Sequence, residues 1–191
     1  MVVGLGNPGP DFQDTRHNAG FWFLDQWAGN RGLSFRKPWF RPFLFASAQQ
    51  NGNTLVFVKP LTFVNRSGQL FPHLLSRFGA TADDLVVVFD QMDLPAGRAR
   101  MKPHGSSGGH NGLKSIDQAL GHGRYHRIVV GVGRPGPGVS VVDHVLGAPD
   151  PGDRVSIDAT LGRVIQGIDE RWWQGWEPWI NAVNQRDADR S

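Results

Sequence analysis

The 191-residue chain contains no cysteine, and this absence excludes several kinds of site. Without thiols there can be no disulfide framework, no cysteine-based zinc ribbon and no thiol nucleophile. The chain also has no apolar run of transmembrane length, and its first residues lack both the basic region and the apolar core of a signal peptide. We therefore expect a soluble cytoplasmic protein with no membrane partner.

Acidic residues are missing from two long stretches. Residues 26–82 contain seven Lys and Arg and no acid, and residues 94–142 contain seven more beside a single acid, Asp117. The formal net charge is only +3, because the acids gather elsewhere. Most of these cations are arginines, which suit bidentate phosphate contacts. The segregation indicates a basic face and an anionic partner, with nucleic acid the leading candidate, although charges segregated in sequence can also mix on a folded surface.

Short apolar runs alternate with helical patterns along the chain. The runs predict strands at residues 1–5, 43–48, 55–58, 84–89, 98–102 and 127–132. Helical spacing and capping residues predict helices near 21–29, 70–79, 111–121 and from 150 onward. The tryptophan-rich segment 172–179 should be broken at Gly175 and Pro178. The alternation predicts an α/β protein: a single three-layer α/β/α domain over residues 1–185, whose twisted mixed β-sheet is flanked by helices, with residues 186–191 as a frayed tail.

Two glycine-rich segments have the pattern of well-known motifs, but their local sequence argues against both. The glycines of residues 4–9 have the spacing of a dinucleotide-binding turn, yet Pro8 and Pro10 remove amide donors that a pyrophosphate needs. A nucleotide-binding oxidoreductase is therefore the weaker alternative. Residues 105–109 fit a nucleophile elbow, but neighbouring proline and glycines keep strand and helix away from it. We interpret both segments as loops.

The histidines predict no metal centre. His122 and His126 have the spacing of a helical metal-binding pair. Gly121 and Gly123 argue against a helix at that point, so a solvated loop is the better interpretation.

Histidine, carboxylate and amide side chains follow several predicted strands. His17 lies in a polar loop, and Asp90 follows a buried strand. A histidine held by an aspartate is the usual general-base pair, because the carboxylate fixes the tautomer and stabilises the imidazolium. Uncharged amides can hold a carbonyl, a water or an oxyanion, although loop asparagines also form turns and caps. By chemistry alone, these residues suggest water-mediated hydrolysis of a neutral ester or amide.

Six blocks of the sequence together resemble the bacterial peptidyl-tRNA hydrolase family. They keep the family's order from residue 3 to about residue 147, and jointly they are highly specific. The blocks are VGLGNPG at 3–9, TRHNAG at 15–20, KPLTFVNRSG at 59–68, DQMDLPAG at 90–97, SGGHNGLKSI at 107–116 and HRIVVGVGRP at 126–135.

The resemblance implies a monomeric esterase that needs neither metal nor cofactor. Its substrate would be peptidyl-tRNA: it would cleave the ester between the peptide C-terminus and the 3′-terminal ribose, recycling tRNA from aborted translation. By position, His17 would be the general base that activates water, and Asp90 the carboxylate that orients it. Asn7 would hold the histidine and the substrate end, and Asn111 the attacking water or the developing oxyanion.

Further positions would bind the substrate. Asn65 would hold the peptide main chain. Four more residues would line the cleft: Phe12, Phe63, Val64 and His110. The tRNA phosphates would contact three cations: Lys102, Lys114 and Arg127.

The sequence departs from the family at several of these places. Phe12 and Val64 stand where the family commonly has Tyr and Met, so a hydroxyl is lost and the apolar wall is altered. Val129 replaces an arginine that contributes to phosphate binding, and Arg98 and Arg100 are candidates to compensate for it. An RNA-binding relative that has lost catalysis is the main alternative, but pure binding does not need a histidine–aspartate pair.

Overall fold

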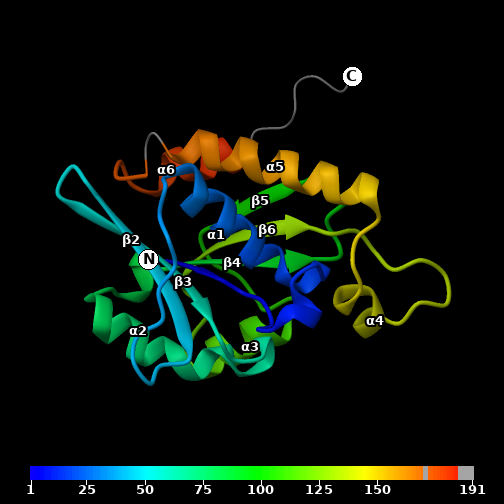
Figure 1. Ribbon diagram of the computed structural model, residues 1–191, viewed down its shortest axis with the longest axis horizontal. Coiled ribbons are helices and arrows are strands. Elements are labelled where there is room, and N and C mark those ends of the chain that lie inside the picture. Colours follow the sequence, from blue (N-terminus) through cyan, green and yellow to red (C-terminus); the bar gives the residue numbers. More distant parts are fainter. Residues whose placement is uncertain (170–171, 185–191) are drawn as a thin grey trace.

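The computed structural model describes residues 1–169 and 172–184, and the expected tail at 186–191 lies outside them. Six strands of the described chain form one mixed sheet in the order β2-β3-β1-β4-β6-β5 (Figure 1). Their bounds are β1 Val2–Gly4, β2 Phe43–Gln50, β3 Asn53–Pro60, β4 Val86–Gln91, β5 Ala99–Lys102 and β6 His126–Gly131. The inner four are parallel, whereas β2 and β5 are antiparallel edge strands. The predicted α/β class and the mixed sheet are confirmed.

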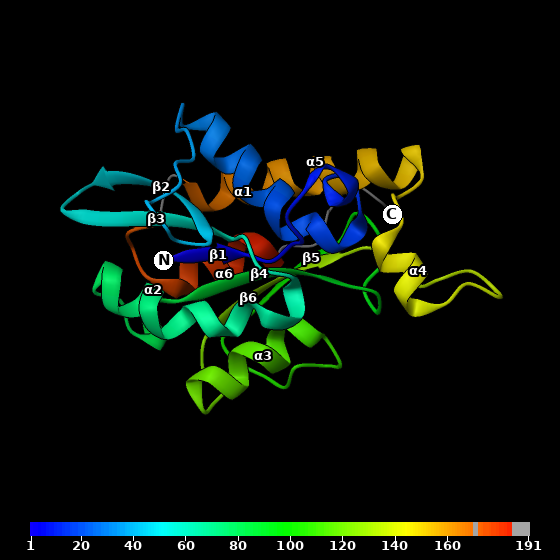
Figure 2. The same ribbon diagram turned by 60° about the horizontal axis from the view of Figure 1, so that its bottom comes forward.

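Helices cover both faces of the sheet. Figure 2 shows α1 and α5 on one side and α2 and α3 on the other, so the three predicted layers are present. The α-helices are α1 Ala19–Asn30, α2 Phe71–Phe78, α3 Asn111–Leu120, α4 Val141–Leu146, α5 Pro151–Asp169 and α6 Trp176–Asn184. Short 3-10 segments are η1 Pro10–Phe12, η2 Arg16–Asn18, η3 Val64–Leu70 and η4 Ala82–Asp84. None of the described helices is long and apolar enough to cross a membrane.

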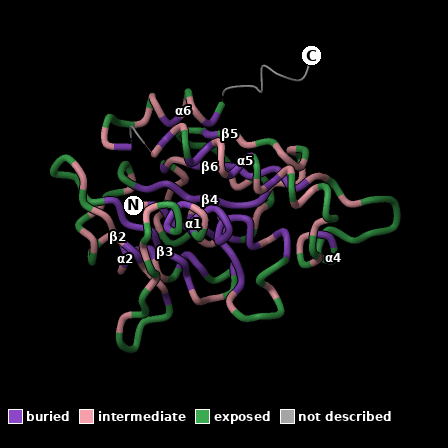
Figure 3. The backbone as a smooth tube through the Cα atoms, turned by 45° about the horizontal axis from the view of Figure 1, so that its top comes forward, coloured by how far each residue is buried: buried purple, intermediate pink, exposed green. Residues whose placement is uncertain are grey.

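Alternate residues of the buried strands face the two helical layers. On β4, Val86 and Val88 belong to the core cluster under α1 and α5, whereas Val87 and Phe89 belong to the cluster under α2 and α3. Because side chains alternate along a strand, one covered on both faces has a continuous apolar sequence. This is why residues 84–89 could be predicted as a buried strand. Figure 3 shows the buried residues concentrated in the sheet, with exposed loops around it.

Close contact between α1 and the sheet fixes the segment before that helix. A Cβ atom on Gly20 would lie 2.4 Å from the Val88 carbonyl oxygen and 2.5 Å from the Leu5 nitrogen, so this approach requires glycine. The first turn of α1 therefore rests directly on the ends of β1 and β4. His17, in η2 just before the helix, is held over those strand ends.

The tryptophan-rich segment packs into the core. Trp172 and Trp179 are buried, and the Trp179 ring centroid lies 5.5 Å from that of Trp27. The predicted break at Pro178 is wrong. Pro178 lies in the first turn of α6, where its missing N–H costs no helical hydrogen bond. Gly175, with a φ of 97°, does interrupt the chain just before that helix.

Candidate active site

The residues expected to be catalytic meet at the carboxyl ends of β1 and β4. Asp90 lies near the end of β4, Asn7 follows β1, and His17 lies in η2 between β1 and α1. Neighbouring parallel strands bring their carboxyl ends to one edge of the sheet, where open α/β folds place their sites. The structure therefore brings together residues that are 73 positions apart in sequence.

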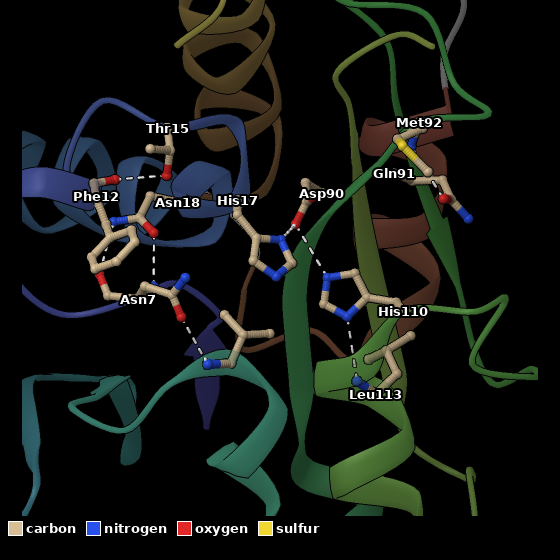
Figure 4. A network of polar contacts seen from close by, with 11 residues as sticks. Asn7, Phe12, Thr15, His17, Asn18, Asp90, Gln91, Met92, His110 and Leu113 are labelled. Atoms are coloured by element: carbon tan, nitrogen blue, oxygen red, sulfur yellow. Dashed lines mark hydrogen bonds and ion pairs between the residues drawn. The ribbon is translucent and has the colours of Figure 1, made fainter. Parts of the chain in front are cut away.

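His17 and Asp90 form a short hydrogen bond. Nδ1 of His17 lies 2.7 Å from Oδ1 of Asp90, whose side chain is only 2% exposed. An ionised carboxylate only accepts, so Nδ1 carries the proton and the lone pair of the neutral ring is on Nε2. Nε2 has no hydrogen-bond partner among the described residues, and the His17 side chain is still 15% exposed. This nitrogen can therefore take a proton from a water molecule. Figure 4 shows the His17 ring beside Asp90.

The surroundings keep Asp90 ionised and make His17 more basic. Burial alone would raise the pKa of Asp90, but the His17 charge and hydrogen bonds from His110 and His17 outweigh it and hold that pKa well below its usual range. Burial likewise opposes protonation of His17. The charge of Asp90 and its hydrogen bond outweigh this effect, so the pKa of His17 is raised above its ordinary value of 6.5.

His110 is a second partner of the buried carboxylate. Its Nε2 lies 3.1 Å from Oδ1 of Asp90, while its Nδ1 accepts a hydrogen bond from the Leu113 backbone at the start of α3. Because Nδ1 accepts, the proton is on Nε2 and points at the carboxylate. Figure 4 shows the two imidazoles on either side of Asp90, with ring centroids 5.1 Å apart. Two donors therefore hold one carboxylate in position.

The same three side chains have the composition of a metal site. Possible ligand atoms of His17, Asp90 and His110 lie within 4.8 Å of one another, and two histidines with one carboxylate suit several transition metals. Both rings, however, share one oxygen of Asp90, and the other nitrogen of His110 is bonded to Leu113. This geometry fits a hydrogen-bond network among His17, Asp90 and His110 better than a set of metal ligands.

Asn7 joins three segments but does not contact His17. Its Oδ1 accepts a hydrogen bond from the Val64 backbone at 2.9 Å. Its backbone N–H donates to Oδ1 of Asn18 at 2.8 Å, and Nδ2 of Asn18 donates back to the Asn7 carbonyl at 3.1 Å. The expected direct contact between Asn7 and His17 is therefore absent, because the oxygen of Asn7 is used by η3. Nδ2 of Asn7 has no partner among the described residues and remains available as a donor.

The residues expected to bind the peptide lie around this network, with one exception. Phe63 is 53% exposed, and the rings of Phe12 and Phe63 meet edge to face with centroids 6.1 Å apart. Asn65 and Asn111 are exposed at the beginnings of η3 and α3. Val64, by contrast, is only 2% exposed, because it packs where α3 approaches η3 closely. Val64 therefore supports the cleft from behind and does not line its surface.

A groove of about 250 Å³ is lined by Phe89 and Gln91, the sequence neighbours of Asp90, by Asp93 and Arg127, and by the loop 105–108. Lys102 and Arg100 of β5 also line it, and both are exposed and form no ion pair with a described residue. Arg100 pairs directly with Val129 on β6. Directly opposed residues share a face of the sheet, so Arg100 places a guanidinium beside the position of Val129. Arg98 does not line this groove.

Arg127 does not extend the exposed basic surface, contrary to expectation. It is only 2% exposed, and its guanidinium donates to the backbone oxygens of Ser106 and Gly123 and to Asp117. Its role is to hold the loop 105–108 that forms one wall of the groove. Lys114 is exposed on α3, as a phosphate contact requires.

Two residues beside His17 carry structural roles that the sequence did not assign. Nη1 of the buried Arg16 donates to three backbone oxygens at the end of α4, those of His144, Gly147 and Ala148. The side chain of Asn18 forms hydrogen bonds with the backbone of Asn7 and does not cap α1. Both lie in the conspicuous TRHNAG block, but their partners are far away in sequence, and only the fold shows them.

The α/β fold and the histidine–aspartate pair at its strand ends fit an enzyme of the hydrolase class. More particularly, the chain belongs to the peptidyl-tRNA hydrolase family, whose model matches residues 1–191. It is 38% identical over 170 residues to the peptidyl-tRNA hydrolase of Geobacillus kaustophilus, covering 89% of this chain and 91% of that one. The structure of peptidyl-tRNA hydrolase from Acinetobacter baumannii matches with a TM-score of 0.88 at 30% identity, covering 96% and 93% of the two chains. A structure of peptidyl-tRNA hydrolase with N-propanol matches with the same values. The resemblance read from the six blocks is confirmed.

Proposed function

We propose that this chain hydrolyses the ester between a peptide and the 3′-terminal ribose of tRNA, using water activated by His17. Membership of the family supports the reaction. The observation that carries the mechanism is the 2.7 Å contact between His17 and Asp90, which leaves Nε2 of the histidine free. We also propose that the working unit is a monomer, as the family resemblance implies.

The geometry supports a general-base reaction. Nε2 of His17 accepts a proton from water while the water oxygen attacks the ester carbonyl. The imidazolium that forms is stabilised by Asp90, which is already ionised and fixed by two donors. The same proton then passes to the ribose oxygen as the ester bond breaks. The products are a free ribose hydroxyl and the peptide carboxylic acid, which keeps the water's second proton until it ionises to the carboxylate by releasing that proton to solvent.

Amide side chains would serve the uncharged parts of the substrate. Asn111 and Nδ2 of Asn7 are the proposed donors to the developing oxyanion, because they stabilise it without adding charge. Asn65 would hold the peptide main chain, and the exposed ring of Phe63 with Phe12 behind it would contact peptide side chains.

Measuring release of tRNA from N-acetylated aminoacyl-tRNA tests the proposal. The purified protein should hydrolyse this substrate at the same rate with and without EDTA. Hydrogen bonds join His17, Asp90 and His110, so the proposed mechanism needs no metal ion that EDTA could remove. A wild-type protein that releases no tRNA would disprove the hydrolase function. A rate lost with EDTA and restored by added metal would disprove the metal-free mechanism.

The groove beside the site is the proposed position for tRNA phosphates, contacted by Lys102 and Arg100, with Lys114 beyond it. Lys102→Ala and Arg100→Ala should each raise KM by up to about fivefold, the value of one exposed charge contact. The effect on kcat should be smaller, because phosphate contacts position the RNA without touching the ester. Each substitution should also lower the slope of log affinity against log salt by about one. Steady-state kinetics over a salt series gives both quantities.

Arg77→Gln is the matched control for these two variants. Arg77 is exposed in the last turn of α2 and does not line the groove. Its substitution should leave KM unchanged. An Arg100→Ala enzyme with wild-type KM and salt slope would show that Arg100 does not replace the arginine missing at Val129.

A further inference from the structure

The loop 36–42 carries the two most exposed large hydrophobic side chains of the described residues. Trp39 is 85% exposed and Phe40 is 89% exposed. The loop connects α1 to β2 (Figure 1) and takes no part in the site proposed above. Large aromatic rings are rarely left in water without a use, because their burial is strongly favourable. We call residues 36–42 the aromatic–basic loop.

A tight turn projects both rings from the surface. The Arg41 N–H donates to the Pro38 carbonyl at 3.3 Å, which closes a turn with Trp39 and Phe40 at its tip. Phe40 has a φ of 56°, a left-handed conformation that costs free energy for any residue except glycine. The two ring centroids are 5.3 Å apart and their planes are nearly perpendicular. The backbone is therefore strained at Phe40, in the same turn that holds both rings in solvent.

The charges around these rings all have the same sign. Arg36, Lys37 and Arg41 are exposed, and none of them forms an ion pair with a described residue. Arg36 is fixed by stacking on Phe45, with its guanidinium carbon 4.8 Å from the ring centroid. No acidic residue occurs between positions 26 and 82 of the sequence. The loop thus combines aromatic faces with unneutralised cations.

The loop lies at the same edge of the sheet as the catalytic residues. Phe43, the first residue of β2, pairs with Pro60, the last residue of β3. The Leu61 N–H donates to the Pro42 carbonyl at 2.7 Å, which ties the loop to the segment that leads into Phe63 and η3. A long polymeric ligand in the active site could therefore continue along this edge onto the loop.

We propose that the aromatic–basic loop binds single-stranded RNA, with Trp39 and Phe40 stacking on bases and Lys37 and Arg41 contacting phosphates. Aromatic platforms combined with a basic surface are how proteins hold single strands without reading their sequence. Tryptophan and cations also suit an anionic membrane surface. RNA is favoured because the loop adjoins a site whose own proposed substrate is an RNA. The inference goes beyond that function, since binding by this loop requires no hydrolysis.

The test measures binding of the full-length protein to a short, unstructured, fluorescently labelled RNA by anisotropy. Trp39→Ala should weaken binding by about fivefold to 150-fold, the range for loss of one stacked base. Trp39→Phe should restore most of the affinity. Arg41→Gln should lower the salt slope by about 0.7, the value for one phosphate contact on a single strand. These measurements use no ester, so the loop and the hydrolase function can fail independently.

Phe40→Gly separates binding from folding. Glycine adopts a φ of 56° without strain, so this variant should melt no lower than wild type and yet bind RNA more weakly. The controls are Arg124→Gln and Val155→Ala, which change an exposed cation and an exposed apolar residue outside the loop and should bind RNA normally.

Wild-type affinity in Trp39→Ala, or an equal loss in the control variants, would overturn the proposal. Co-sedimentation with vesicles containing phosphatidylserine forms a second arm. If the Trp39→Ala protein loses vesicle binding but keeps RNA binding, the loop faces a membrane and the RNA proposal is wrong.

Discussion

Replacing His17 by alanine should reduce kcat for peptidyl-tRNA by about 10²–10⁴-fold, the usual contribution of a positioned general base. KM should change little, because Nε2 of His17 is expected to contact the attacking water and not the tRNA. The remaining rate would come from Asn7, Asn111 and the bound substrate geometry. Initial rates of tRNA release at saturating and limiting substrate separate the two constants.

The His17→Ala enzyme must be shown to fold, because it leaves a buried carboxylate with one partner fewer. His110 still donates to Asp90, so a native circular-dichroism spectrum is expected, with some loss of thermal stability. His104→Ala is the matched control: His104 is exposed, and its replacement should affect neither rate nor stability. If the folded His17→Ala enzyme kept the wild-type rate, another group would have to be the base.

The parts of the fold that the sequence predicts best are those fixed by local patterns. The continuous valines of residues 84–89 require burial on both faces, and Gly79 and Gly121 end α2 and α3 with positive φ as C-terminal caps. The helix α4 was not predicted; it spans only six residues, and Val141, Val142 and Leu146 are exposed. Pro178 misled the prediction because the rule against proline does not apply to a first turn.

The active site shows a different limit. The sequence was sufficient to predict that His17 and Asp90 act together. A histidine in a polar loop and an aspartate after a buried strand have the chemistry of a general-base pair, and the family motifs contain both residues. Whether a cation is free or neutralised depends on partners distant in sequence. From the sequence, Arg127 is expected to be an exposed cation, because it follows a turn. In the structure its guanidinium donates to the Ser106 backbone oxygen and to the Asp117 carboxylate. The pairing of Arg100 with Val129 required the register between β5 and β6, which no local pattern specifies.

Asp90→Asn should change the pH dependence of the reaction as well as its rate. In the wild-type enzyme the pKa of His17 lies above 6.5, so kcat/KM should fall as pH decreases through that raised value, where the base becomes protonated. Asparagine removes the negative charge that raises this pKa and leaves the burial that lowers it. The acid limb should therefore move to lower pH. The plateau should drop by about 10²–10⁴-fold, because an amide neither fixes the tautomer nor stabilises the imidazolium.

Asp83→Asn provides the control for this experiment. Asp83 lies in η4, just before the same strand, is exposed and does not line the groove, so its replacement should move neither the limb nor the plateau. The two readouts for Asp90→Asn have different physical origins. A lower plateau with an unmoved limb would mean that Asp90 only orients the ring and that another charge raises the pKa of His17. A limb that moved to higher pH would contradict the electrostatic role outright, because a carboxylate 2.7 Å from the imidazole can only favour its protonated form.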